Sequence, residues 1–281
     1  MPKKTGTARA GYPEVMQAQT RASGHYRGDV GDSTDTTPLV LTGERTLPGI
    51  ADENYWFRRH EAAYRATVPF VTGAVVLEAG CGEGYGGDLL ATTAHRVVAL
   101  DYDQLTTAHV RDAYRSLEVV RGDLQRLPLG DSSVDAVVCM QVIEHLWDQS
   151  GFVTECARVL RTAGTLMIST PNRLTFSPSG AVLNPFHTRE LDAAELTELL
   201  TPSFVVTRMY GLRHGRRLTR FERRHGSVVA AQTAGPPETW SASVRRVVHR
   251  VRTRDFVIDE DDVDTSLDLV VVARKPTSAD P

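Results

Sequence analysis

The 281-residue chain has little of what marks disulfide scaffolds, membrane proteins or nucleic-acid binders. Its three cysteines, Cys81, Cys139 and Cys156, are odd in number and lack metal-ligand spacing, so we expect reduced interior thiols. No apolar run has the length of a signal peptide or a membrane span. The formal net charge of −3 does not favour broad affinity for nucleic acid. We therefore expect a cytoplasmic protein that neither inserts stably into membranes nor binds nucleic acid.

A glycine-dense turn follows directly after an apolar run. Residues 75–79 hold four apolar side chains and the carboxylate Glu78, a pattern typical of a strand that is covered on both faces. Glycine lets a ligand approach the backbone closely. The spacing Gly82-x-Gly84-x-x-Gly87 also matches the generic dinucleotide fingerprint, so this turn alone leaves a nicotinamide or flavin enzyme open. The expected ligand contacts in this segment are Glu78, Gly80, Cys81, Gly82 and Gly84.

Two further apolar runs also end in carboxylates. Residues 97–100 lead into Asp101, which lies 19 residues after Gly82. This offset is close to the ~20 residues at which an acid meets ribose hydroxyls in doubly wound folds. Residues 117–124 contain Asp123, which could accept a hydrogen bond from an adenine amino group. Three carboxylates at successive strand ends suit a ligand with a cation, a ribose and an adenine. Further expected contacts are Tyr102, Leu124 and Gln141.

In this order the motifs resemble those of the class I S-adenosylmethionine-dependent methyltransferases, from about Asn54 to Pro202 and again near the C-terminus. The resemblance implies S-adenosylmethionine as cofactor and a Rossmann-like, doubly wound α/β fold. Its seven-stranded sheet would be mostly parallel with an antiparallel last strand, beside an N-terminal cap helix. In that helix Tyr55, Trp56 and Arg59 would hold the methionine part, with Arg59 on its carboxylate. Core packing is the alternative for Tyr55 and Trp56.

The segment after the fourth strand supplies candidate bases for activating an acceptor. An alcohol is a poor nucleophile, and neutral histidine is a suitable base at physiological pH. His145 is the first choice, and His187, after the fifth strand, is the second. Glu144 could be the base, could orient His145 or could cap the next helix. A divalent ion could bind Glu144, Asp148 or His187, but no acid cluster has metal-ligand spacing, so we expect none.

We expect the chain to divide into a disordered tail over 1–37, a cap segment over 38–68 and a methyltransferase domain over 69–281. Acceptor-side insertions are expected at about 176–200 and 211–265. From Arg208 to Arg254 twelve arginines accompany two acids, and six acids follow within residues 255–264. These charges form either a solvated or mutually paired surface, or a basic wall that guides an anionic or polyhydroxyl acceptor.

Four segments resemble a narrower group, the actinobacterial methyltransferases linked to glucose-containing saccharides. They are residues 42–46, 53–60, 141–148 and 184–191. Members of the group act on methylglucose lipopolysaccharide or on the mycofactocin oligosaccharide. The resemblance implies O-methylation of a hexose, expected to be glucose, in an oligo- or polysaccharide, with S-adenosylhomocysteine as product. A small-molecule or quinone O-methyltransferase and a non-catalytic cofactor-binding module are the alternatives. The oligomeric state is left open.

Overall fold

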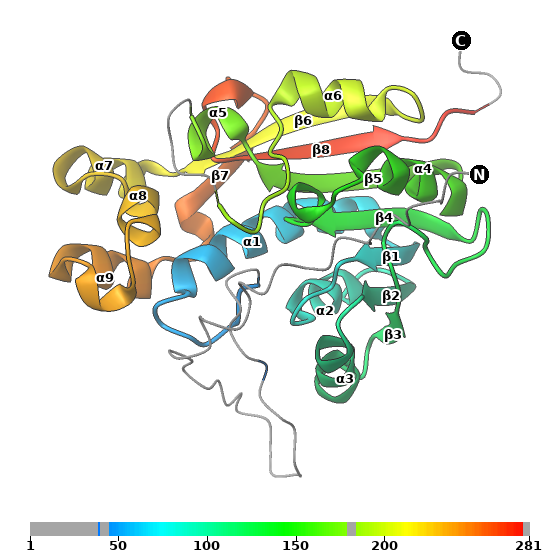
Figure 1. Ribbon diagram of the computed structural model, residues 1–281, viewed down its shortest axis with the longest axis horizontal. Coiled ribbons are helices and arrows are strands. Elements are labelled where there is room, and N and C mark those ends of the chain that lie inside the picture. Colours follow the sequence, from blue (N-terminus) through cyan, green and yellow to red (C-terminus); the bar gives the residue numbers. More distant parts are fainter. Residues whose placement is uncertain (1–38, 40–44, 179–183, 278–281) are drawn as a thin grey trace, which may run out of the picture.

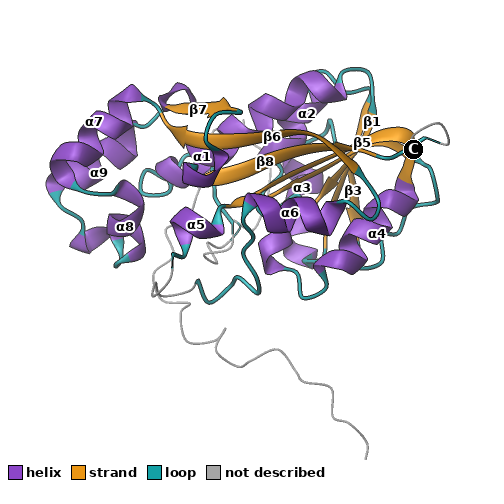
Figure 2. Cartoon of the chain, turned by 90° about the horizontal axis from the view of Figure 1, so that it is seen from above, coloured by secondary structure: helices purple, strands orange, loops and turns teal. Residues whose placement is uncertain are grey.

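The computed structural model describes Leu39, residues 45–178 and residues 184–277 (Figure 1). The tail expected over 1–37 lies outside these residues. A single sheet of eight strands runs through the molecule in the order β3-β2-β1-β4-β5-β8-β6-β7. Helices lie on both faces of this sheet (Figure 2). The predicted doubly wound α/β class is therefore confirmed.

Five parallel strands form one half of the sheet, and antiparallel pairs form the other. The parallel strands are β1 (Val75–Ala79), β2 (Arg96–Asp101), β3 (Glu118–Arg121), β4 (Val134–Met140) and β5 (Leu160–Pro171). The remaining strands are β6 (Val205–His214), β7 (Phe256–Asp259) and β8 (Asp268–Arg274). β8 pairs antiparallel with β5, which confirms the expected direction of the last strand.

The predicted count of seven strands was wrong because the segment 211–265 contains an additional strand. β6 continues to His214, and its last four residues pair antiparallel with β7. β7 has only four residues and is followed by a run of acids, so its own sequence gives a weak strand signal. Pairing with the extended end of β6 makes it the edge of the sheet.

The cofactor half has helices before β1 and after the carboxyl ends of β1, β2 and β4. They are α1 (Asn54–Thr67), η2 (Val68–Val71), α2 (Tyr85–Ala91), α3 (Gln104–Ala113), η3 (Ile143–His145) and α4 (Gln149–Val159). Asp103 caps α3 by accepting from the Leu105 N–H, and Asp148 caps α4 by accepting from the Gly151 N–H. These caps fix where the chain leaves β2 and where it turns after β4.

The C-terminal part adds α5 (Arg173–Phe176), α6 (Ala193–Leu200), α7 (Arg216–His225), α8 (Val228–Thr233), η4 (Pro237–Thr239), α9 (Ala242–Arg250), η5 (Thr253–Asp255) and η6 (Val263–Thr265). Asp192 and Glu195 form a reciprocal capping box at the start of α6. Helices α7 to α9 form a small group at one end of the sheet, beside α1 and α5 (Figure 2). No helix of the described residues is long and apolar enough to span a bilayer.

Alternating side chains of the strands divide the core into two layers. Val76 and Val97 pack in the layer that includes α1, whereas Leu77 and Val98 pack in the layer with α4 and α6. Cys81, Cys139 and Cys156 are buried and free, which confirms the expected interior thiols. The sheet is therefore covered on both sides, and its strand ends remain available for a ligand.

Candidate active site

The glycine turn after β1 has the backbone that its sequence predicts. Gly80, Gly82 and Gly84 have φ values of +83°, +52° and +104°, a region that side chains other than glycine rarely adopt. A Cβ on Gly80 would lie 2.6 Å from Val142 Cγ2, whereas a Cβ on Gly82 would meet nothing within 4 Å. The turn therefore lies against the residues that follow β4, and Gly82 borders open space. This space fits a ligand that approaches the backbone closely.

The carboxylate at the end of β2 contacts this turn. Asp101 Oδ2 accepts from the Gly82 N–H at 3.0 Å, and Asp101 Oδ1 accepts from the Asp103 N–H at 3.0 Å. Burial raises the pKa of Asp101, and its backbone donors oppose that shift. Asp123 is exposed, Tyr102 is 61% exposed and Leu124 is buried. Their contacts with ribose and adenine stay predictions.

Glu78 lies beneath the glycine turn. Its side chain is 1% exposed, and Oε1 accepts from the Tyr64 hydroxyl at 2.8 Å. A Cβ on Gly86 would lie only 2.6 Å from the same oxygen, so the carboxyl group packs against the first turn of α2. Burial raises the pKa of Glu78 to about 8. The carboxyl group thus contacts the turn from the core side, and its contact with the ligand stays a prediction, as does that of the buried Cys81.

The cap helix α1 places Arg59 inside the molecule. Arg59 Nε and Nη2 donate to Asp268 Oδ2 and Oδ1 at 2.6 and 2.5 Å, and both residues are 1% exposed. Nη1 is buried and has no hydrogen-bond partner among the described residues. One edge of the guanidinium is thus held by β8, and Nη1 is left for the predicted methionine carboxylate, a role that stays a prediction.

The two aromatic residues of α1 differ in their surroundings. Tyr55 is fully buried, and its hydroxyl lies 2.6 Å from His214 Nε2, so it packs in the core. Trp56 lies edge-on to Phe176 at 6.5 Å between ring centroids, and the Arg59 guanidinium lies over the Trp56 ring at 5.3 Å. Trp56 is therefore nearer to the acceptor-side loop than Tyr55, whose core-packing alternative describes its observed contacts.

Arg45 and Thr46 were missed as site residues by the sequence analysis. Arg45 Nη2 lies 3.0 Å from Asp103 Oδ2, and Arg45 Nη1 donates to Thr106 Oγ1 at 2.6 Å. Thr46 Oγ1 lies 3.1 Å from the Tyr85 hydroxyl. These contacts hold the segment before α1 against the starts of α2 and α3. Only its resemblance to the narrower group had singled the segment out.

The acceptor side brings the three predicted catalytic residues together. His145 Nδ1 lies 2.9 Å from the Phe186 carbonyl oxygen, and the rings of His145 and His187 are 5.0 Å apart. Thr170 Oγ1 donates to Glu144 Oε2 at 3.1 Å. Burial raises the pKa of Glu144 to about 7, against the opposing effect of His187. The Glu144 carboxyl group therefore changes charge near neutral pH.

Gln141 forms the corner between β4 and this group. Its φ is +57°, its N–H donates to the Ser169 carbonyl at 2.8 Å, and its Nε2 donates to Ser169 Oγ at 2.8 Å. A left-handed residue other than glycine is strained and persists only where the surroundings hold it. Both bonds to β5 supply that support, so the chain turns directly from β4 towards His145.

Glu144, His145 and His187 could also hold a metal ion, since one ligand atom of each lies within 4.8 Å of the others. However, His187 already contacts Glu190 Oε1 at 2.6 Å through Nδ1 and Asn184 Nδ2 at 3.1 Å through Nε2. Asp148, the third residue considered as a metal ligand, accepts from the Gly151 N–H in the cap of α4. In the described part of the chain, His145 Nε2 has no hydrogen-bond partner. The expectation of no metal stays a prediction.

His60 is a third residue that the sequence did not mark as part of the site. Burial lowers its pKa to about 4, Asp268 opposes this shift, and Arg59 and His145 lower the pKa further. A histidine with this pKa is neutral at pH 7. Its position directly after Arg59 on α1 was visible in the sequence, but its electrostatic contact with His145 depends on how α1 packs beside β4.

Known proteins are similar to this chain in sequence and in fold. A model of the methyltransferase domain family matches residues 77–168. A protein of Mycolicibacterium smegmatis, named a probable S-adenosylmethionine-dependent methyltransferase, is 53% identical over 257 residues, 88% of this chain and 100% of that protein. A ubiquinone biosynthesis O-methyltransferase of Xanthomonas oryzae pv. oryzae is 32% identical over 108 residues, 37% of this chain and 45% of that protein.

A solved structure shows the same fold at low sequence identity. It comes from a Haloferax volcanii protein in complex with a methyltransferase activator, and it has a TM-score of 0.57 and 20% identity. The match covers 82% of this chain and 93% of that chain. This likeness shows the fold, and the 53% identity to the whole of the Mycolicibacterium smegmatis relative shows the family. The chain belongs to the S-adenosylmethionine-dependent methyltransferases and uses S-adenosylmethionine as its cofactor.

Proposed function

We propose that the protein transfers a methyl group to a hexose hydroxyl of an oligo- or polysaccharide, with His145 as the general base. S-adenosylmethionine supplies a methyl carbon that is activated by its sulfonium. The observation that carries the proposal is the His145 ring, whose Nδ1 is held 2.9 Å from the Phe186 carbonyl. Nδ1–H donates there in the neutral tautomer, so Nε2 is left to accept the proton of the hydroxyl.

The surroundings of His145 suit a base that becomes charged during transfer. Ligand-capable atoms of Glu144 and His187 lie within 4.8 Å of those of His145. An ionised carboxylate at this range stabilises an imidazolium, particularly in a poorly hydrated site. The packing of Gly80 against Val142 brings the glycine turn beside the same segment. Methyl transfer needs the nucleophile in line with the departing sulfur, so this proximity supports the assignment.

Trp147 supports an acceptor with an apolar ring face. Its side chain is 83% exposed and lies two residues after His145. A large exposed indole offers apolar contact area with one polar edge, as the C–H face and hydroxyls of a hexose require. His145, Trp147, Asn184 and His187 also come from the two segments that resemble saccharide methyltransferases. The quinone-type alternative rests on the Xanthomonas relative, whose match covers 37% of the chain.

Labelled S-adenosylmethionine should transfer its methyl group to glucose oligosaccharides rather than to a catechol-type quinone precursor. Linkage analysis of the product would identify the hydroxyl.

The Trp147→Ala variant should raise KM for the saccharide about tenfold, with a smaller change in kcat, because the indole binds ground and transition states alike. Phe70→Ala, which removes an aromatic side chain that is 42% exposed near the start of β1, is the matched control. Methylation of the catechol alone would overturn the proposal.

Asp101→Ala should weaken S-adenosylmethionine binding about tenfold to a hundredfold. The variant lacks the carboxylate, so the charge-assisted bonds to the ribose are lost and the Gly82 N–H loses its acceptor. Such bonds contribute roughly 1.5–3 kcal/mol each. Isothermal titration measures the dissociation constant directly. Asp112→Ala removes an exposed acid from α3 and should leave affinity unchanged. Equal affinity of the Asp101→Ala variant and the unaltered protein would remove Asp101 from the cofactor site.

A further inference from the structure

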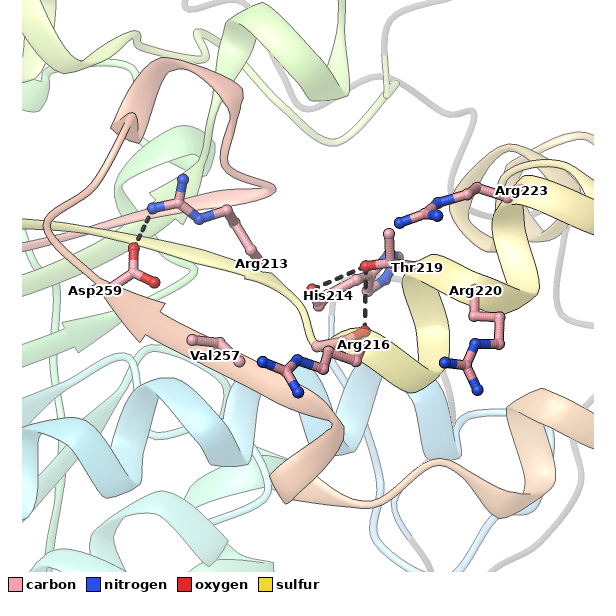
Figure 3. Close-up of a pocket in the computed structure, with 9 residues that line it drawn as sticks. Arg213, His214, Arg216, Thr219, Arg220, Arg223, Val257 and Asp259 are labelled. Carbon is pink, nitrogen blue, oxygen red and sulfur yellow. Dashed lines mark hydrogen bonds and ion pairs between the residues drawn. The ribbon is translucent and has the colours of Figure 1, made fainter.

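A pocket of about 430 Å³ lies between α7, β6 and the edge strand β7. Four arginines line it, Arg213, Arg216, Arg220 and Arg223, together with the single acid Asp259. Figure 3 shows Arg213 paired with Asp259 on one side and the arginines of α7 on the other. The pocket wall thus carries three more positive charges than negative ones.

Helical spacing places three of these arginines on one face of α7. Arg216, Arg220 and Arg223 are related by four and three residues, so their side chains are neighbours on the helix surface. Like charges at this spacing destabilise a helix. Arg216 also occupies the first turn, where the helix dipole disfavours a cation, and no acid lies in that turn. The arrangement therefore has an electrostatic cost that an anion would offset.

The acids of residues 255–264 do not neutralise these three arginines. Among these acids, Glu260 contacts Arg208, Asp259 contacts Arg213 and Asp255 contacts Arg217. The guanidinium groups of Arg216, Arg220 and Arg223 make no hydrogen bond or ion pair within residues 45–178 and 184–277. The sequence offered a paired surface and a basic wall as alternatives. Pairing describes part of the segment, and the pocket retains the unpaired charge.

The remaining polar wall is fixed and does not compete for a ligand. His214 Nε2 lies 2.6 Å from the Tyr55 hydroxyl, and Nδ1 lies 2.9 Å from Glu222 Oε2. Thr219 Oγ1 donates within the first turn, to the carbonyls of His214 and Gly215 at 3.1 Å. Through Tyr55 the pocket backs onto α1, whose next residue, Trp56, contacts the acceptor-side residue Phe176. His145 and His187 are not among the residues that line the pocket.

We propose that this pocket binds the phosphate group of a small phosphorylated ligand. Guanidinium groups form paired N–H bonds to phosphate oxygens, and three unpaired guanidiniums match a doubly charged tetrahedral anion. The volume lies within the roughly 300–1,000 Å³ range of small-molecule sites. A pocket lined by three unpaired arginines suits a small soluble anion better than a flat lipid surface.

Isothermal titration with inorganic phosphate and with glucose 1-phosphate tests the site without acceptor or cofactor. Arg216→Ala and Arg223→Ala should each weaken binding of both probes about tenfold, because each removes charge-assisted bonds. Two matched controls should bind as the unaltered protein does. Arg111→Ala and Arg115→Ala each remove an exposed arginine near β3, at the opposite edge of the sheet. Unchanged S-adenosylmethionine affinity would confirm that the variants are folded.

Three outcomes would overturn the proposal. The first is the absence of binding by either probe, and the second is equal weakening in all four variants, which would indicate only general charge attraction. The third is binding to phosphatidylcholine vesicles that contain phosphatidic acid without binding to either soluble probe, which would assign the arginines to a membrane surface. Because the assay uses neither acceptor nor methyl donor, its failure leaves saccharide methylation untouched, and failure of saccharide methylation leaves the pocket untouched.

Discussion

The His145→Ala variant should turn over about 10²- to 10⁴-fold more slowly than the unaltered enzyme, the usual contribution of a positioned general base. Its affinity for S-adenosylmethionine should remain unchanged, because the ring lies on the acceptor side and its Nδ1 contacts the Phe186 carbonyl, not the glycine turn. Single-turnover methyl transfer measures the chemical step, and isothermal titration measures cofactor affinity. The two readouts separate loss of the base from loss of the fold.

His95→Ala is the matched control for this experiment, since His95 is exposed at the start of β2, far along the sheet from the carboxyl ends of the strands. Its activity should equal that of the unaltered enzyme. Full activity of His145→Ala would move the base to His187 or Glu144.

Chelator treatment tests whether a metal ion takes part in the reaction. Complete loss of activity that added divalent metal restores would show that Glu144, His145 and His187 hold an ion, and would contradict the role of His145 as a free base.

Arg59→Met should lower the free energy of unfolding by about 3–5 kcal/mol, because it leaves the Asp268 carboxylate buried without its counter-ion. Asp268 is 1% exposed and accepts two N–H bonds from Arg59. These bonds join α1 to the central antiparallel strand β8, so the loss should also loosen the cap helix. Urea denaturation monitored by circular dichroism measures the change. S-adenosylmethionine affinity should fall as well if Nη1 holds the methionine carboxylate.

The adjacent residue gives a closely matched control. Arg58 pairs with Glu61 on the same helix, but its side chain is 37% exposed, so Arg58→Met should cost no more than about 1 kcal/mol. Adding Asp268→Asn to Arg59→Met removes the unpaired charge and should recover much of the stability. Equal losses for Arg58→Met and Arg59→Met, or no recovery in the double variant, would show that the buried ion pair is not what stabilises α1 against β8.

Local patterns predicted the cofactor half of the molecule well. The apolar runs before Glu78, Asp101 and Asp123 appear as β1, β2 and β3, and the glycines adopt the left-handed backbone that the turn requires. These features depend on a few consecutive residues, so sequence spacing records them directly. The additional strand β7 was missed because it has only four residues and joins the sheet only by pairing with the end of β6.

Partner choice between distant segments was not predictable in this way. Arg59 was expected to face the cofactor, and its main partner, Asp268, lies 209 positions further along the chain. Similarly, the acids of residues 255–264 neutralise some arginines of the basic segment and leave Arg216, Arg220 and Arg223 without partners in the described part of the chain. Composition gives the number of charges. The fold decides which of them meet.

By itself the sequence determined the methyl donor, because the glycine turn and the acids that follow the strands are local signals of a nucleotide-like ligand. It also named His145 as the first candidate base, with Glu144 and His187 as alternatives. Only the tertiary structure decided their states: it holds His145 by one nitrogen, engages both nitrogens of His187, and buries Glu144 deeply enough to raise its pKa to about 7. Hydrogen bonding and desolvation depend on neighbours that are distant in the chain, so no local pattern encodes them.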